Sequence, residues 1–245
     1  MTEGRTIAIA SGKGGVGKTW FAITLAHALA RQDGHVLLFD ADLGLANVDI
    51  QLGLTPRHDL GAVISGRATL ADATLRHPDG GFAIIAGHSG SGALSAIDPA
   101  RLDAMLTALR REAAGYATVL LDLGAGLDRA VRRMSAWADA LLVLATEEPT
   151  SLTDAYAVMK LYAADRPQGD VRVVVNQAAN RHTGERTFAT LERACQTFLG
   201  RAPTLAGIVR RDDRVRDAIR RQTLMLLRHP ASPAAADVEA IARSL

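Results

Sequence analysis

Cysteine is scarce in this sequence, and long apolar runs are missing. The 245 residues include one cysteine, Cys195, which excludes an internal disulfide framework and a thiolate-held metal cluster within one chain. We expect it to be a small core residue. The longest apolar runs, such as Ala140–Ala145, fall far short of the roughly 20 residues that a membrane span requires. No basic and apolar leader precedes the first predicted strand, so we expect a cytoplasmic chain without a transmembrane helix.

The chain has little net charge, and few of its basic residues are lysines. The formal net charge of +2 is too low to imply nucleic-acid binding. Only Lys13, Lys18 and Lys160 among the 28 basic residues are lysines, and two of them lie in one glycine-rich loop. A compact ammonium differs chemically from a planar guanidinium. Lysine in a chain that otherwise uses arginine therefore indicates that this loop needs an ammonium group.

Short apolar runs alternate with amphipathic stretches along the chain. Such alternation is typical of an α/β fold with a doubly wound, mostly parallel sheet and helices on both faces. With no repeat or linker, we expect one domain over residues 1–245, with a mainly helical section from about residue 210. In chain order the runs are Thr6–Ala10, Phe21–Gln32, Val36–Asp40, Phe82–Ala86, Leu102–Arg111, Thr118–Asp122, Ala130–Trp137, Ala140–Thr146, Ser151–Ala163, Val171–Asn176, Thr187–Leu199, the short strand Thr204–Val209, Asp213–Gln222 and Pro233–Leu245.

One loop carries the strongest functional signal. The first predicted strand runs directly into Ser11–Trp20, and the residues that follow have helical periodicity. Gly12–Thr19 fits G-x-x-x-x-G-K-[ST], in which glycines let the backbone wrap phosphates and turn its N–H groups inward. A glycine-rich structural turn is the alternative. The pattern favours a P-loop for Mg-ATP, with nucleotide-binding residues Gly12, Lys13, Gly14, Gly15, Val16, Gly17, Lys18, Thr19 and Trp20.

Two side chains of this loop have specific expected roles. Lys18 is expected to pair with the β- and γ-phosphates and to act in catalysis. The Thr19 hydroxyl is expected to bind Mg²⁺, and the helix N-terminus adds its positive end. ATP and Mg²⁺ are therefore the expected cofactors.

The extra lysine identifies a family. The run K-G-G-V-G-K-T resembles the deviant Walker A motif of the MinD/ParA ATPases. In that family the first lysine reaches across a dimer interface to the partner's nucleotide, so the resemblance implies a catalytic role for Lys13 in an ATP-bound homodimer. A solvated loop lysine is the alternative.

The resemblance extends to the loops after two further strands. Leu38–Asp49 resembles the family's switch I, which implies that Asp40 lies near the magnesium shell and that Asp42 orients the attacking water. Val119–Gly126 resembles the Walker B strand and switch II, which implies that Asp122 meets Mg²⁺ through water and that Gly124 lies at the nucleotide. Helix capping is the alternative for the carboxylates. Because ligands of open α/β sheets bind outside the strand ends, these loops should converge.

Another strand, Val173–Asn176, ends in an amide. In the family this Asn hydrogen-bonds adenine, which makes Asn176 a nucleotide-binding candidate by resemblance. An Asn that caps a turn would look the same.

Several stretches resemble the FlhG branch of the family, also called FleN or YlxH, which regulates flagellar number and placement. They are Gly44–Gly53, Gly87–Gly90, Asp122–Gly126, Glu148–Tyr156, Arg220–Gln222 and His229–Ala234. The resemblance implies that Glu148 touches the partner's nucleotide and that Asp212 lies at the nucleotide edge. It also implies flagellar or other polar partners, with an FlhF-like GTPase and basal-body components as candidates.

Other features depart from that branch. Only Met1–Arg5 precede the first strand, so we expect no N-terminal extension of the kind by which some FlhG proteins stimulate FlhF. The end, Val238–Leu245, is short and nearly neutral, so we expect membrane association to be weak or indirect. The arginines of segment 210–221 alternate with Asp212, Asp213 and Asp217 without aromatic residues, which favours a solvated face over a protein-partner surface or binding to nucleic acid.

The sequence thus predicts a slow ATPase that dimerises with Mg-ATP and regulates flagellar number or placement, in the cytoplasm and at the pole or membrane periphery. A ParA-like partitioning ATPase on the nucleoid is one alternative. A nucleotide-gated scaffold that positions another polar machine without turnover is the second.

Overall fold

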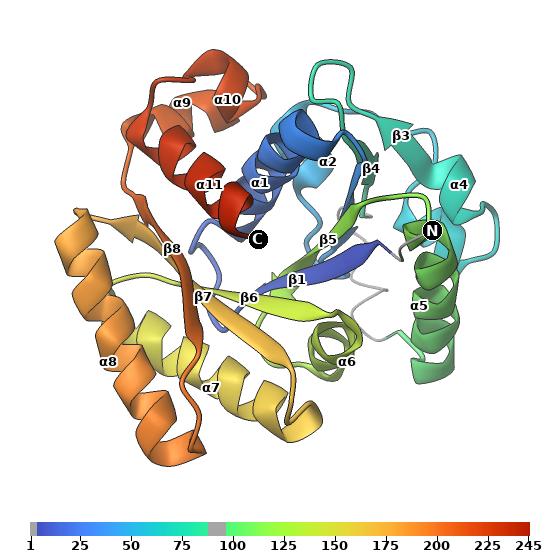
Figure 1. The fold of residues 1–245 in the computed structure, drawn as a ribbon. Coiled ribbons are helices and arrows are strands. Elements are labelled where there is room, and N and C mark those ends of the chain that lie inside the picture. Colours follow the sequence, from blue (N-terminus) through green and yellow to red (C-terminus); the bar gives the residue numbers. More distant parts are fainter. Residues whose placement is uncertain (1–3, 88–96) are drawn as a thin grey trace.

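A single sheet runs through the centre of the molecule (Figure 1). The computed structural model describes residues 4–87 and 97–245. Within them, eight strands follow the order β3-β4-β2-β5-β1-β6-β7-β8, and all neighbours are parallel except β3 and β4. The strands are β1 (Arg5–Ser11), β2 (Val36–Ala41), β3 (Thr74–Arg76), β4 (Ala83–Ile85), β5 (Thr118–Ala125), β6 (Ala140–Ala145), β7 (Asp170–Ala178) and β8 (Thr204–Arg210).

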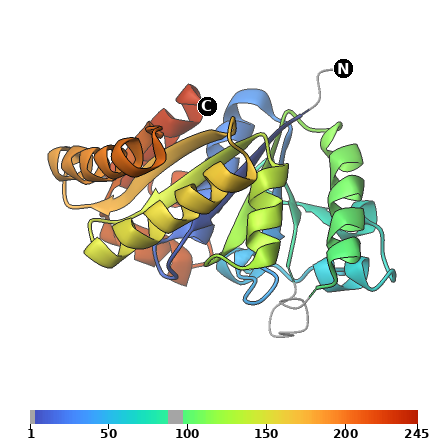
Figure 2. The same cartoon turned by 90° about the horizontal axis from the view of Figure 1, so that it is seen from below.

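Helices cover both faces of the sheet (Figures 1 and 2). One layer packs α1 and α11 together with α2, α9 and α10, and the other is made by α5 to α8. Because both faces are covered, the central strands β2 and β6 are buried at every residue. The helices are α1 (Lys18–Asp33), α2 (Val48–Leu52), α3 (Leu60–Ile64), α4 (Leu70–Ala73), α5 (Pro99–Ala113), α6 (Arg129–Trp137), α7 (Pro149–Asp165), α8 (Arg181–Leu199), α9 (Asp213–Arg220), α10 (Met225–Arg228) and α11 (Pro233–Ser244).

The expected doubly wound α/β fold is confirmed, with differences in detail. Helix α8 begins at Arg181 rather than at Thr187, because the Asn180 side chain accepts a hydrogen bond from the Thr183 backbone and caps the helix. The antiparallel edge strand β3 was not predicted, since three residues are too short to show a periodicity. The short helices α2, α3, α4 and α10 were missed for the same reason. Cys195 is buried, as expected.

The arginine-rich segment 210–221 is mostly exposed to solvent. Arg210 binds the buried carboxylate of Asp237 on α11 at 2.8 Å. Only the Arg221–Asp217 pair, at 3.9 Å, joins two residues of the segment, and Asp217 also binds Arg228 and His229. Five of the six arginines of the segment are exposed, as expected for a solvated face, whereas Arg210 ties β8 to α11.

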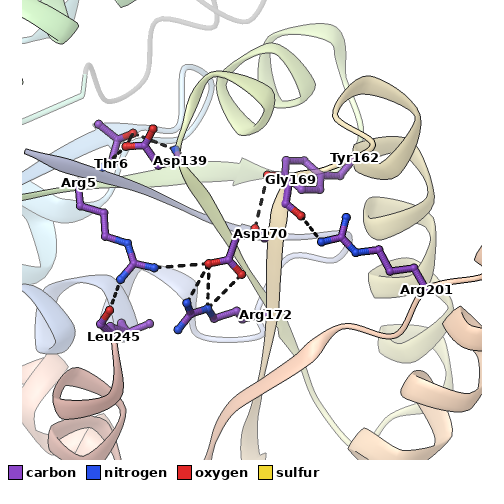
Figure 3. Close-up of polar contacts among 9 residues, drawn as sticks. All are labelled: Arg5, Thr6, Asp139, Tyr162, Gly169, Asp170, Arg172, Arg201 and Leu245. Carbon is purple, nitrogen blue, oxygen red and sulfur yellow. Dashed lines mark hydrogen bonds and ion pairs between the residues drawn. The ribbon is translucent and has the colours of Figure 1, made fainter. Parts of the chain in front are cut away.

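The amino ends of the strands carry a network of opposite charges (Figure 3). Asp170 at the start of β7 binds Arg172 at 2.9 Å and Arg5 of β1 at 3.5 Å. Asp139 accepts hydrogen bonds from the backbone and hydroxyl of Thr6 at 2.8 and 2.7 Å. These contacts tie the start of β1 to the start of β7 and to the residue just before β6. No helix of the described residues is long and apolar enough to cross a membrane.

Candidate functional site

The glycine-rich loop joins β1 to α1 at the carboxyl edge of the sheet. Gly17 has a φ of 89° at the N-cap of α1, a conformation that favours glycine. A Cβ on Gly17 would also lie 2.7 Å from the Asn176 side-chain nitrogen, whereas one on Gly14 or Gly15 would meet nothing within 4 Å. The loop is therefore tight where it meets the protein and open on its outer side, as a phosphate cradle must be.

Lys18 is the buried lysine of this loop. It is the first residue of α1, and its side chain lies beside Asp122 and Asp42. Burial lowers the pKa of Lys18, and the two carboxylates partly oppose that shift. Residue 18 is only 9% exposed, so its charge is placed inside the site rather than in solvent.

Two carboxylates face each other across the adjacent strands β2 and β5. Asp40 and Asp122 are register partners and are 0% and 1% exposed. Burial, together with the charge of Asp122, raises the pKa of Asp40 to about 7. Burial also raises the pKa of Asp122 to about 6, against the opposing effects of a hydrogen bond from Thr19 and the charge of Lys18. The pair concentrates like charge in a place where a cation would be favoured.

Asp40 also organises the loop that follows it. Its carboxylate accepts backbone hydrogen bonds from Asp42 at 3.2 Å, and from Asn47 and Val48 at 3.0 Å each. Both oxygens thereby accept hydrogen bonds, and Oδ2, which accepts from Asn47 and Val48, caps the start of α2. In this structure Asp40 shapes switch I, a role that the sequence did not reveal.

Asp42 is held in a different way. One of its oxygens, Oδ1, accepts backbone hydrogen bonds from Gly44 at 3.1 Å and Leu45 at 2.9 Å. A Cβ on Gly124 of β5 would lie 3.2 Å from the same oxygen, so glycine at this position lets the two switch segments approach closely. The structure thus brings Asp42 and Gly124 together beside Lys18, as expected for loops at the carboxyl ends of parallel strands.

Lys13 points away from this interior. Its Nζ donates to Glu148 Oε2 at 2.6 Å and to the Thr150 hydroxyl at 3.2 Å, at the start of α7. The side chains of Lys13 and Glu148 are 40% and 65% exposed, and the lysine lowers the pKa of the carboxylate. The two residues that the resemblance assigns to a partner's nucleotide therefore bind each other within one chain.

Of the two adenine-side candidates, only Asn176 contacts the loop. Asn176 is buried at the end of β7 and donates through Nδ2 to the Val16 carbonyl at 2.8 Å, so it braces the P-loop. Asp212 follows β8, and its Oδ1 caps α9 by accepting the Arg214 backbone hydrogen bond. Trp20 lies in the core on α1 with 6% exposure, so its side chain faces away from the loop's outer side.

The residues fit a magnesium nucleotide. Asp122 Oδ1 is buried and has no hydrogen-bond partner among residues 4–87 and 97–245, which leaves one acceptor for a metal-bound water. In the described part of the chain no group of three or more His, Cys, Asp or Glu side chains is arranged to bind a metal alone. Mg²⁺ binds few carboxylates and takes its other ligands from waters and phosphates. Thr19 and Asp122 are the residues that could hold it, whereas both oxygens of Asp40, the third candidate, already accept backbone hydrogen bonds.

Some parts of the site lie outside sequence reasoning or outside the structure. Thr150 lies in the stretch Glu148–Tyr156 that resembles the FlhG branch, but its hydrogen bond with Lys13 was not predicted, because the two residues are 137 positions apart. Gln177, whose side chain donates to the Gly15 carbonyl at 3.4 Å, was missed for a similar reason, although its φ of 57° marks it as unusual. Of the run Gly87–Gly90, residues 88–90 lie outside the described residues.

Comparison with known proteins identifies the family. The model of the CobQ/CobB/MinD/ParA nucleotide binding domain matches residues 7–225. The chain belongs to this family. The match spans the loop, both switch segments and the adenine-side candidates, and it confirms the MinD/ParA resemblance.

Individual relatives of this family agree. The antiactivator FleN of Pseudomonas aeruginosa is 36% identical over 98% of the chain and 86% of its own length. The flagellum site-determining protein YlxH of Helicobacter pylori is 29% identical over 76% of the chain and 62% of its own length. The solved structure of Pyrococcus horikoshii MinD, complexed with Mg-ADP, shares the fold with a TM-score of 0.81, at 22% identity over 98% and 95% of the two chains.

Proposed function

We propose that this chain is an ATP-driven switch that binds Mg-ATP, pairs with a second copy, hydrolyses the nucleotide slowly and controls the number or placement of flagella. The contrast between the two loop lysines carries the proposal. Lys18 is buried beside Asp122, whereas Lys13 extends over the surface to Glu148. A lysine in that position is poorly placed for its own phosphates and well placed to reach a second molecule.

Each residue has a role in this proposal. Lys18 and the loop backbone bind the phosphates, and Thr19 with Asp122 holds Mg²⁺, which supplies charge neutralisation when bound. Asp42 positions the attacking water, and Asn176 and Asp212 lie at the adenine edge. Lys13 exchanges its bond to Glu148 for the partner's nucleotide, so the exposed ion pair is broken when the dimer forms. An exposed pair of this kind costs little to break.

The flagellar part rests on the relatives. FleN is named an antiactivator and YlxH a flagellum site-determining protein, and FleN matches nearly the whole chain. Partners at the flagellar base or pole, and weak or indirect contact with the membrane, belong to this proposal. In cells that lack this chain, the number or position of flagella should change, and wild type but not the Lys13→Ala variant should restore it. Unchanged flagella would remove the flagellar assignment.

The enzymatic part has a separate test. ATP turnover per subunit should rise with protein concentration if two chains assemble the site. Lys13→Ala should remove that dependence, while Lys160→Ala, a change at an exposed lysine on α7, should leave it intact. Turnover that is independent of concentration in wild type would contradict a dimeric active site, and absence of turnover would favour the scaffold alternative.

A further inference from the structure

The turn between α9 and α10 contacts the short helix α2. The Gln222 side chain donates through Nε2 to the Ile50 carbonyl of α2 at 2.8 Å. A Cβ on Gly53, the residue that follows α2, would lie 3.0 Å from Gln222 Oε1 and 3.2 Å from Gln222 Cβ and Cδ. One side chain thus holds the end of α2 by a hydrogen bond and by close packing. We call this contact of Gln222 with Ile50 and Gly53 the α2 clamp.

Gln222 has a backbone conformation that is unusual for its residue type. Its φ is 51°, in the left-handed region where glycine is the common residue after a helix. Its backbone N–H donates to the Ile219 carbonyl at 3.0 Å, just after the end of α9. Gln222 is also exposed, so it does not fill the core. A glutamine at a position that suits glycine indicates that the side chain itself has a use.

The other end of α2 is held by Asp40. Its Oδ2 accepts the backbone hydrogen bonds of Asn47 and Val48 at 3.0 Å each, and its Oδ1 accepts that of Asp42 at 3.2 Å. A helix of five residues is too short to be stable by its own hydrogen bonds, so tertiary contacts set its position. A continuous series of contacts therefore leads from Gln222 through α2 and Asp40 to Asp42.

We propose that Gln222 is a positioning residue for ATP hydrolysis: it fixes α2, and through Asp40 it keeps the Asp42 carboxylate aligned with the attacking water. The catalytic part rests on the proposed role of Asp42, whereas the mechanical part, from Gln222 to the amides that bind Asp40, does not. Loss of the α2 clamp should slow the chemical step and leave ATP binding intact, because the clamp includes no residue of the phosphate loop.

Two substitutions remove the α2 clamp in different ways. Gln222→Gly takes away the side chain, but glycine adopts the left-handed conformation without strain, so the variant should melt close to the wild-type temperature. Gln222→Glu keeps the shape and sets a carboxylate oxygen, which only accepts hydrogen bonds, against the Ile50 carbonyl. An effect that both variants share at an unchanged melting temperature comes from the clamp and not from a general loss of stability.

Backbone amide NMR signals, recorded without nucleotide, test the mechanical part. The amides of Asn47, Val48 and Asp42 donate to Asp40, and their signals should shift in both variants. The Val131 amide at the start of α6 is the reference, and its signal should keep its wild-type position. Unmoved Asn47, Val48 and Asp42 signals would overturn the proposal, whatever the rate of turnover.

Steady-state kinetics test the catalytic part. In both variants kcat should fall several-fold, while KM for ATP should stay within about twofold of the wild-type value. Gln168→Glu, the same change of charge at an exposed glutamine before β7, should behave as wild type. A wild-type kcat in both variants, or a rise in KM with kcat unchanged, would contradict a positioning role. Wild-type protein without any turnover would contradict the proposed function, and the amide signals would still decide whether Gln222 sets the contacts of Asp40.

Discussion

The two ends of the parallel sheet differ in how their charged side chains are arranged. At the amino ends, Asp170 lies between Arg5 and Arg172, so each charge has an opposite neighbour (Figure 3). At the carboxyl ends, Asp40 and Asp122 lie side by side in the interior with one nearby cation, the buried Lys18.

The paired charges at the amino ends contribute to stability, whereas the like charges at the carboxyl ends are typical of a functional site. Opposite charges at a half-exposed surface stabilise modestly and need nothing further. Like charges in a buried site are unfavourable until a cation arrives, and such perturbed groups are typical of binding and catalytic centres. The protein thus retains an electrostatically strained edge where the nucleotide is proposed to bind, and a relaxed edge at the opposite end.

Removal of Lys18 should give the largest effect at the strained edge. Lys18→Ala leaves Asp122 without its cation and removes the proposed phosphate contact. ATP affinity should fall on the order of 1,000-fold, about 4 kcal/mol, as measured by calorimetry. Lys160→Ala is the matched control and should bind ATP as wild type does. Equal losses in both variants would contradict a specific role for Lys18.

His27 is a buried group with a perturbed pKa that lies outside the strained edge. It is 2% exposed on α1 next to Phe82, and burial with the charges of Arg31 and His77 lowers its pKa from 6.5 to about 4. As the pH falls, the unfolded chain takes up a proton on His27 before the folded protein does. Protonation therefore favours the unfolded chain, and the free energy of unfolding is highest above pH 6.5 and decreases as the pH falls toward 4. The loss should be on the order of 3 kcal/mol.

Urea unfolding of wild type and His27→Leu at a series of pH values measures this effect. The variant should lose less stability than wild type over the same range. Parallel curves for the two proteins would show that His27 is not the titrating group.

A cut in the amino-end network should affect stability alone. Asp139→Ala removes the acceptor for the Thr6 backbone and hydroxyl. The free energy of unfolding should fall by about 1–2 kcal/mol. ATP affinity should stay unchanged in the same preparation. A clear loss of ATP affinity would mean that the two ends of the sheet are coupled.

The smallest expected effect is a gain in stability, at Asp122. Asp122→Asn removes one of the two adjacent like charges and keeps a similar shape. Without nucleotide, the melting temperature should rise by about 2–4 °C, which corresponds to roughly 1 kcal/mol. The further rise on addition of Mg-ATP should be smaller than in wild type. A lower melting temperature of the free variant would contradict the idea of a strained edge.

Local features of the sequence predicted much of this fold and site. The P-loop could be read because its residues are contiguous and its glycines have one physical purpose, and the buried strands showed as apolar runs. The Lys13–Glu148 pair and the hydrogen bonds on Asp40 join residues whose contact depends on the folded loops. Gln222 and Ile50 both lie in stretches that carry the resemblance, but the hydrogen bond from the Gln222 side chain to the Ile50 carbonyl, across 172 positions, was not predicted for the same reason.

The most direct test of the ATP-driven switch is the solution mass of the Asp42→Ala protein by light scattering in Mg-ADP and in Mg-ATP, because slow or absent hydrolysis preserves the ATP state. The account predicts a monomer in Mg-ADP, a doubled mass in Mg-ATP, and no doubling when Lys13→Ala is added. A mass that stays constant in both nucleotides would contradict the account and remove the proposed role of Lys13.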